Sequence, residues 1–99
     1  MRYRIDTRLR PGEVFALARK YFGPEGPVGL DLTTLNPNQI GFAGGGGFIM
    51  ISAHRGLSQT RLDFEVYQLD QEVQAFFDQL PGPEGRIRAA IRRLLRRKR

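Results

Sequence analysis

The sequence contains no cysteine, so the chain can form no disulfide, thiolate metal site or cysteine nucleophile. No apolar run approaches the ~20 residues that a membrane-spanning helix needs. The first residues also lack the pattern of a signal peptide, because apolar positions alternate there with arginine and aspartate. These absences predict a soluble, cytoplasmic protein without covalent cross-links.

Side chains suited to catalysis are few. His54 is the only histidine, and no paired spacing of acidic residues supplies further metal ligands. A catalytic triad would have to use Ser52 or Ser58, and neither stands in a nucleophile-elbow sequence. Asp63 and Glu65 lie two residues apart, but on the polar face of a predicted strand, where ion pairing keeps carboxylates charged. We therefore expect no enzyme activity, no metal and no cofactor.

Acidic residues are missing from the last fourteen positions, RIRAAIRRLLRRKR. Segment 86–99 holds eight of the sixteen Lys and Arg residues, so it carries +8, whereas the rest of the chain carries −2. Its cationic residues are Arg86, Arg88, Arg92, Arg93, Arg96, Arg97, Lys98 and Arg99. Its apolar residues follow the spacing of one helical face: Ile87, Ala90, Ile91, Leu94 and Leu95. The sequence therefore predicts a basic amphipathic helix at the end of the chain.

Three interpretations of this helix stay open. Its arginines could contact nucleic-acid phosphates without reading sequence. The helix could instead lie on an anionic membrane or meet an acidic protein. Alternatively, its apolar stripe packs on its own domain or on a second copy in a homodimer, and the arginines are simply solvated. Fourteen arginines against two lysines are also typical of a GC-rich coding bias.

Alternation of apolar and polar residues predicts strands at 2–9, 28–34 and 59–68. Ile40 and Phe42 indicate a short further strand. The segment 48–54 is apolar on both faces, which favours a central strand or one whose second face is covered.

Charge predicts one particular strand pairing. Arg4 and Arg8 lie on the polar face of the first strand, and Asp63 and Glu65 lie on that of the last. Pairing these two strands would place opposite charges across the ladder. Helices are predicted at 11–22, after Pro11, and at 70–80, with Asp70 as its N-cap. In the first helix Phe15 lies off the apolar stripe and flanks it.

The run of four glycines and the seven phenylalanines could each have a functional role. Gly44 to Gly47 could form an anion-binding nest or a loop that closes over a partner, but no Lys-Ser or Lys-Thr follows, so a hairpin tip is favoured. An enzymatic use of this loop would require it to converge with His54 and Asp31 or Glu65. The seven phenylalanines mostly fall on buried stripes, and the polar strand face offers Tyr67 as its aromatic residue, so no base-stacking platform is expected.

The order β-α-β-β-β-β-α-α predicts an α+β domain: an antiparallel sheet of four or five strands with helices on one face. This order resembles the TATA-binding-protein-like or helix-grip class. The residues Ile5-Asp6 and Pro11-Gly12-Glu13-Val14-Phe15 are similar to the start of the Bet v 1/START family, over about fifteen residues. We expect an α+β domain at 1–82 and the basic helix at 83–99, packed on the domain or on a partner.

The function predicted from these features is that of a small non-enzymatic binding module. Its arginine helix would contact an anionic partner, with nucleic acid favoured. The main alternative is a carrier of small apolar ligands, with a pocket between sheet and helices. A weaker alternative is association with a membrane surface through the same helix.

Overall fold

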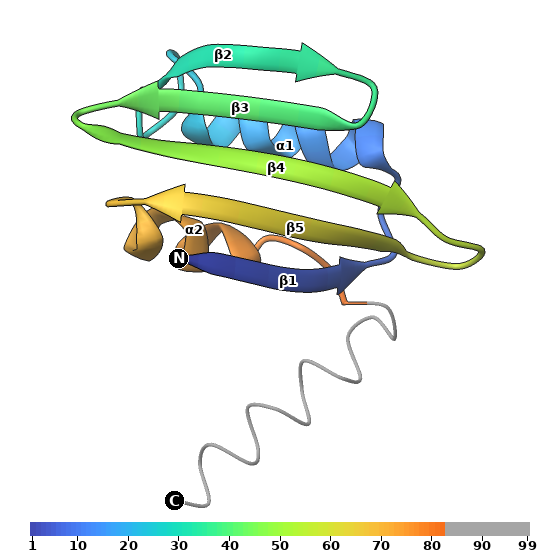
Figure 1. The fold of residues 1–99 in the computed structure, drawn as a ribbon. Helices are drawn as coiled ribbons and strands as arrows, with labels where there is room; N and C mark the ends of the chain where they lie inside the picture. The colour runs from blue at the N-terminus through green and yellow to red at the C-terminus, as the bar shows by residue number, and fades with distance from the viewer. Residues whose placement is uncertain (83–99) are drawn as a thin grey trace, which may run out of the picture.

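Seven elements follow one another in the predicted order. The computed structural model describes residues 1–82, and the predicted basic helix at 83–99 lies outside them. The elements are β1 (Arg2–Thr7), α1 (Pro11–Phe22), β2 (Asp31–Asn36), β3 (Gln39–Gly44), β4 (Gly47–Arg55), β5 (Thr60–Tyr67) and α2 (Asp70–Phe77) (Figure 1). The α+β class is confirmed.

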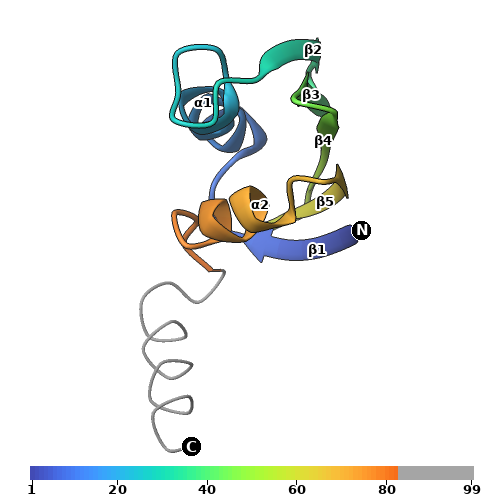
Figure 2. The same ribbon diagram turned by 90° about the vertical axis from the view of Figure 1, so that its left-hand side faces the viewer.

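The five strands form one antiparallel sheet in the order β1-β5-β4-β3-β2. The apolar strand β4 is its central strand, as its sequence predicts. Both helices lie against the same face of the sheet (Figure 2). The opposite face, called here the open face, is covered by no helix of the described part of the chain. β4 therefore turns one side toward the core and the other toward the open face.

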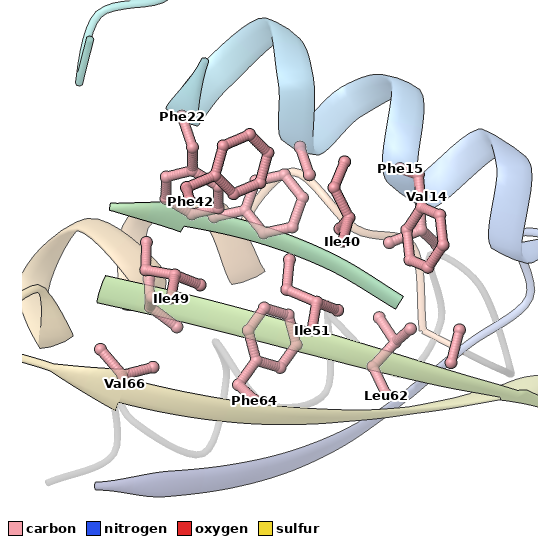
Figure 3. Close-up of a cluster of buried hydrophobic side chains, with 14 of the residues drawn as sticks. Val14, Phe15, Phe22, Ile40, Phe42, Ile49, Ile51, Leu62, Phe64 and Val66 are labelled. Carbon is pink, nitrogen blue, oxygen red and sulfur yellow. The ribbon is translucent and has the colours of Figure 1, made fainter. Parts of the chain in front are cut away.

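The core fills the layer between the helices and the sheet (Figure 3). Phe22 of α1 packs against aromatic rings of both the sheet and the second helix. Its ring centroid lies 5.6 Å from that of Phe42 in β3 and 5.0 Å from that of Phe76 in α2. Phe15, predicted to flank the stripe of α1, is buried with 7% of its surface exposed. The fully buried large side chains include Phe22, Phe42, Phe64, Phe76, Ile40, Ile49, Ile51 and Leu62.

The second predicted strand starts too early by three residues. Gly29 has a φ of 71°, a left-handed conformation that interrupts an extended strand. The amides of Val28 and Leu30 donate instead to the carbonyls of Tyr21 and Phe22 at the end of α1. The connector is thus tied to the helix, and β2 begins at Asp31.

The predicted N-cap of the second helix is wrong. Asp70 is the first helical residue, Leu69 occupies the N-cap, and no side chain caps this end. The Asp70 carboxylate accepts a hydrogen bond from the Tyr3 hydroxyl of β1. This bond raises the pKa of the Tyr3 phenol, because it favours the neutral, donating form. Asp70 therefore connects α2 to the edge of the sheet.

This contact predicts a stability change at alkaline pH. Because the pKa of Tyr3 is higher in the folded chain than its ordinary value of 10.0, the folded state holds the proton longer than the unfolded state. The contribution is fully present below pH 10.0 and is lost as pH rises through the folded pKa. Urea unfolding of wild type and Tyr3→Phe should show a stability difference that shrinks over this range. An equal stability difference at every pH would contradict the raised pKa of Tyr3 and its hydrogen bond to Asp70.

Candidate functional site

All eight cationic residues predicted to bind an anion fall in 86–99, outside the described residues. The structure does show where Pro81, near the end of the described residues, lies relative to the sheet. The Thr7 hydroxyl, fully buried at the end of β1, donates to the Pro81 carbonyl over 2.6 Å. The chain therefore leaves the described part beside an edge strand of the sheet.

The predicted pairing of the first and last strands is confirmed, with Arg4 opposite Asp63 and Arg2 opposite Glu65. Arg4 Nε donates to Asp63 Oδ1 over 2.9 Å, and the Arg2–Glu65 ion pair measures 3.9 Å. The bond from Arg4 lowers the pKa of the Asp63 carboxyl. Arg8 takes no part in the ladder, because β1 ends at Thr7. On the open face, Arg2 and Arg4 are thus both matched by carboxylates.

His54 lies on the same open face and is 62% exposed, with Nε2 3.4 Å from Asp63 Oδ2. Ser52, two residues away on β4, accepts a hydrogen bond from the Gln39 side chain. Such an exposed grouping next to Arg4 resembles a polar sheet surface rather than an enclosed reaction site. The arrangement therefore matches the solvated surface that the sequence favours for Asp63.

The enzymatic alternative required the glycine loop to meet His54, and the fold separates them. Gly47 and His54 stand near opposite ends of β4, seven residues apart, which corresponds to about 23 Å along a strand. The glycine loop and His54 therefore do not meet. The reason is simple: a continuous strand keeps residues at its two ends apart.

The four glycines form a hairpin tip, as predicted. Gly44 of β3 pairs with Gly47 of β4, and Gly45 and Gly46 make the two-residue turn with φ angles of 60° and 83°. Both angles are those of a type I′ turn, which suits the twist of a hairpin and which glycine adopts without strain. The tip borders an open depression of about 480 Å³, lined by Tyr21, Pro27, Val28, Gly29, Leu30, Gly44, Gly45, Leu69 and Glu72.

An exposed aromatic pair on the open face was not predicted. Phe48 of β4 and Tyr67 of β5 are neighbours in the ladder, with ring centroids 6.1 Å apart and planes inclined by 21°. They are 40% and 53% exposed. Phe48 is thus one of the phenylalanines that do not lie on a buried stripe. No sequence signal places Phe48 there, because segment 48–54 is apolar on both faces and alternation does not tell which face is exposed.

Metal-ligating side chains do not gather in residues 1–82. Within this range, no three histidine, cysteine, aspartate or glutamate side chains could hold one ion. Neither described helix is long and apolar enough to cross a membrane. Comparisons with protein families, with curated proteins and with solved structures found no match to this chain.

Proposed function

We propose that this protein is a non-enzymatic binding module whose C-terminal segment 86–99 contacts nucleic-acid phosphates. The observation that supports this proposal is the separation of charge. Segment 86–99 carries +8, and the remainder carries −2. The positions named as its contacts are Arg86, Arg88, Arg92, Arg93, Arg96, Arg97, Lys98 and Arg99.

The pairing of charges in the folded part supports the same choice. Arg4 and Arg2 have carboxylate partners on the open face, so they are poor candidates for binding phosphates. Segment 86–99, by contrast, has no acidic residue in its own sequence, and a helical arrangement is proposed for it. Such a concentration of positive charge attracts polyanions and gives binding that weakens with salt.

Changing four arginines of this segment tests the proposal. In the full chain, replacing Arg92, Arg93, Arg96 and Arg97 with glutamine should weaken binding to labelled duplex DNA and RNA. The slope of log affinity against log salt should become shallower, by about 0.9 for each phosphate of B-DNA that the variant no longer neutralises. Fluorescence anisotropy over a salt series measures both quantities.

A matched variant controls for simple loss of arginine. Arg8, Arg10, Arg19 and Arg55 of the domain can be replaced with glutamine, which removes the same charge elsewhere and should leave the salt slope nearly unchanged. Wild-type chain that binds neither duplex at low salt would refute the proposal. Binding to anionic vesicles in that case would favour the membrane-surface alternative, and binding to an acidic protein would favour that partner.

The depression at the glycine hairpin favours a second candidate, the carrier of small apolar ligands. Val28, Leu30 and Leu69 give it apolar walls, and it lies where α1 ends beside the sheet. A helix-grip-like shape is proposed as part of this alternative. Enhanced fluorescence of an apolar dye that Leu30→Lys removes would support the carrier, and dye fluorescence unchanged by the protein would count against it.

A further inference from the structure

The loop that joins β4 and β5 projects from one end of the sheet (Figure 1). β3 begins opposite Ser52, whereas β4 continues beyond this position to Arg55, which corresponds to about 10 Å along a strand. The amide of Gly56 donates to the carbonyl of Gln59 over 2.7 Å and closes the loop. Leu57 therefore stands at the tip of a hydrogen-bonded hairpin that extends past its neighbours.

Leu57 is the most exposed large hydrophobic side chain of the described residues. Its relative exposure is 106%, against 53% for Tyr67 and 40% for Phe48. No part of the described fold covers it, so its whole side chain is left in water. A single exposed leucine is common on protein surfaces. What distinguishes this one is the set of charges around it.

Four exposed arginines lie at the same end of the sheet: Arg8, Arg10, Arg55 and Arg61. The connection after β1, which carries two of them, is attached to the hairpin, because the Thr60 hydroxyl donates to the Leu9 carbonyl over 2.7 Å. The same hydroxyl accepts a hydrogen bond of 3.2 Å from Arg55. No ion pair within residues 1–82 uses any of the four arginines.

Three carboxylates lie near these cations. Asp6 lies opposite Arg61 in the ladder, and Glu13 accepts a hydrogen bond from a backbone amide at the start of α1. Asp63, farther along β5, is already paired with Arg4. Four arginines against the two remaining carboxylates leave a surplus of positive charge around an apolar tip. This combination is complementary to an anionic membrane surface, where hydrocarbon lies behind a layer of negatively charged headgroups.

We propose that the β4–β5 hairpin binds an anionic membrane surface, with Leu57 inserted among the lipid chains and with four arginines at the level of the lipid phosphates: Arg8, Arg10, Arg55 and Arg61. This inference goes beyond the proposed function and needs no residue of 83–99. Each arginine near an anionic leaflet strengthens binding about fivefold. A nucleic acid offers phosphates but no hydrocarbon, so it gives Leu57 no place to insert.

A fluorescent reporter at the tip tests the insertion directly. The sequence contains no tryptophan, so Leu57→Trp introduces a single one. With the full chain and vesicles of phosphatidylcholine and phosphatidylserine, we expect its emission to shift to shorter wavelength and brominated acyl chains to quench it. Tyr67→Trp is the matched control, because Tyr67 is exposed at the opposite end of β5. The emission of this control should not shift.

Affinity for the same vesicles tests the individual side chains. Leu57→Ser should weaken binding about tenfold, because one leucine side chain no longer leaves water. Replacing Arg8 and Arg61 together with glutamine should weaken it by at least as much. Replacing Arg19 and Lys20 with glutamine removes the same charge from the last turn of α1 and should have a smaller effect. Vesicle sedimentation measures the affinities, and circular dichroism checks that each variant is folded.

The outcomes separate this inference from the proposed function. Vesicle binding without a shift in the emission of the Leu57→Trp variant would overturn the insertion and would leave adsorption to the charges of the chain alone. A wild-type chain that does not bind these vesicles would overturn it as well. Neither result involves nucleic acid, so the proposed function would stand. Conversely, a chain that binds no duplex would refute the proposed function, and the vesicle measurements would still decide this inference.

Discussion

Replacing Phe76 with alanine should lower the free energy of unfolding by about 3–5 kcal/mol. Phe76 is fully buried in α2, and its ring lies 5.0 Å from that of Phe22 and 6.3 Å from that of Phe64. Removing it would leave a cavity where both helices meet the sheet. Since small domains have total stabilities of about 5–15 kcal/mol, a large part of the fold's stability depends on this side chain.

Urea unfolding of the wild type and the variant measures this loss. Phe48→Ala is the matched control, because it removes the same side chain from a position that is 40% exposed. At that position we expect a loss of at most about 1 kcal/mol, set by strand preference and partial burial. Equal losses at the two positions would contradict the view that Phe76 joins the helices to the sheet.

The order of elements could be predicted because local signals determined it. Residues 2–7 and 60–67 alternate so regularly that the face of each side chain follows from sequence, and charge then selected their pairing. Arg4 and Asp63 meet as that reasoning requires. The tip at Gly45 and Gly46 could also be predicted, since a two-residue hairpin turn with positive φ needs residues of this kind.

Features that depend on distant contacts could not be predicted in this way. Asp70 has the sequence setting of an N-cap, yet its carboxylate accepts from Tyr3, which is 67 residues away. The strand at Phe48 is apolar on both faces, so periodicity alone left its exposed side undecided. Val28 and Leu30 alternate like strand residues, but their amides bond to the end of α1. Tertiary hydrogen bonds and packing decide these positions.

Deleting residues 86–99 should abolish nucleic-acid binding and leave the α+β domain folded. The deletion removes eight cations and leaves a chain of charge −2, which duplex DNA would repel. Because each phosphate contact contributes about 0.9 to the salt slope, binding near 0.1 M salt should fall by several orders of magnitude. Anisotropy measures the binding, and urea unfolding measures the stability of the truncated chain.

The described residues supply the reason to expect a folded remainder. They contain fifteen buried hydrophobic side chains, each 0–7% exposed, contributed by both helices, by strands of the sheet and by Leu30 of the connector before β2. The Thr7–Pro81 hydrogen bond lies before the deletion and is kept. A truncated chain that unfolds, or that exposes apolar surface, would contradict this prediction. It would show that the apolar stripe of the segment packs on the domain.

Comparing the deletion with the four-glutamine variant separates charge from packing. The variant keeps Ile87, Ile91, Leu94 and Leu95, whereas the deletion removes them. Each such side chain contributes about 1.5–3 kcal/mol when it is fully buried. If the deletion alone destabilises the chain, the stripe is structural and the arginines can still bind phosphates from a docked helix. If neither change alters stability but both weaken nucleic-acid binding, the segment functions in binding rather than in folding. The four arginines then account for the loss of affinity.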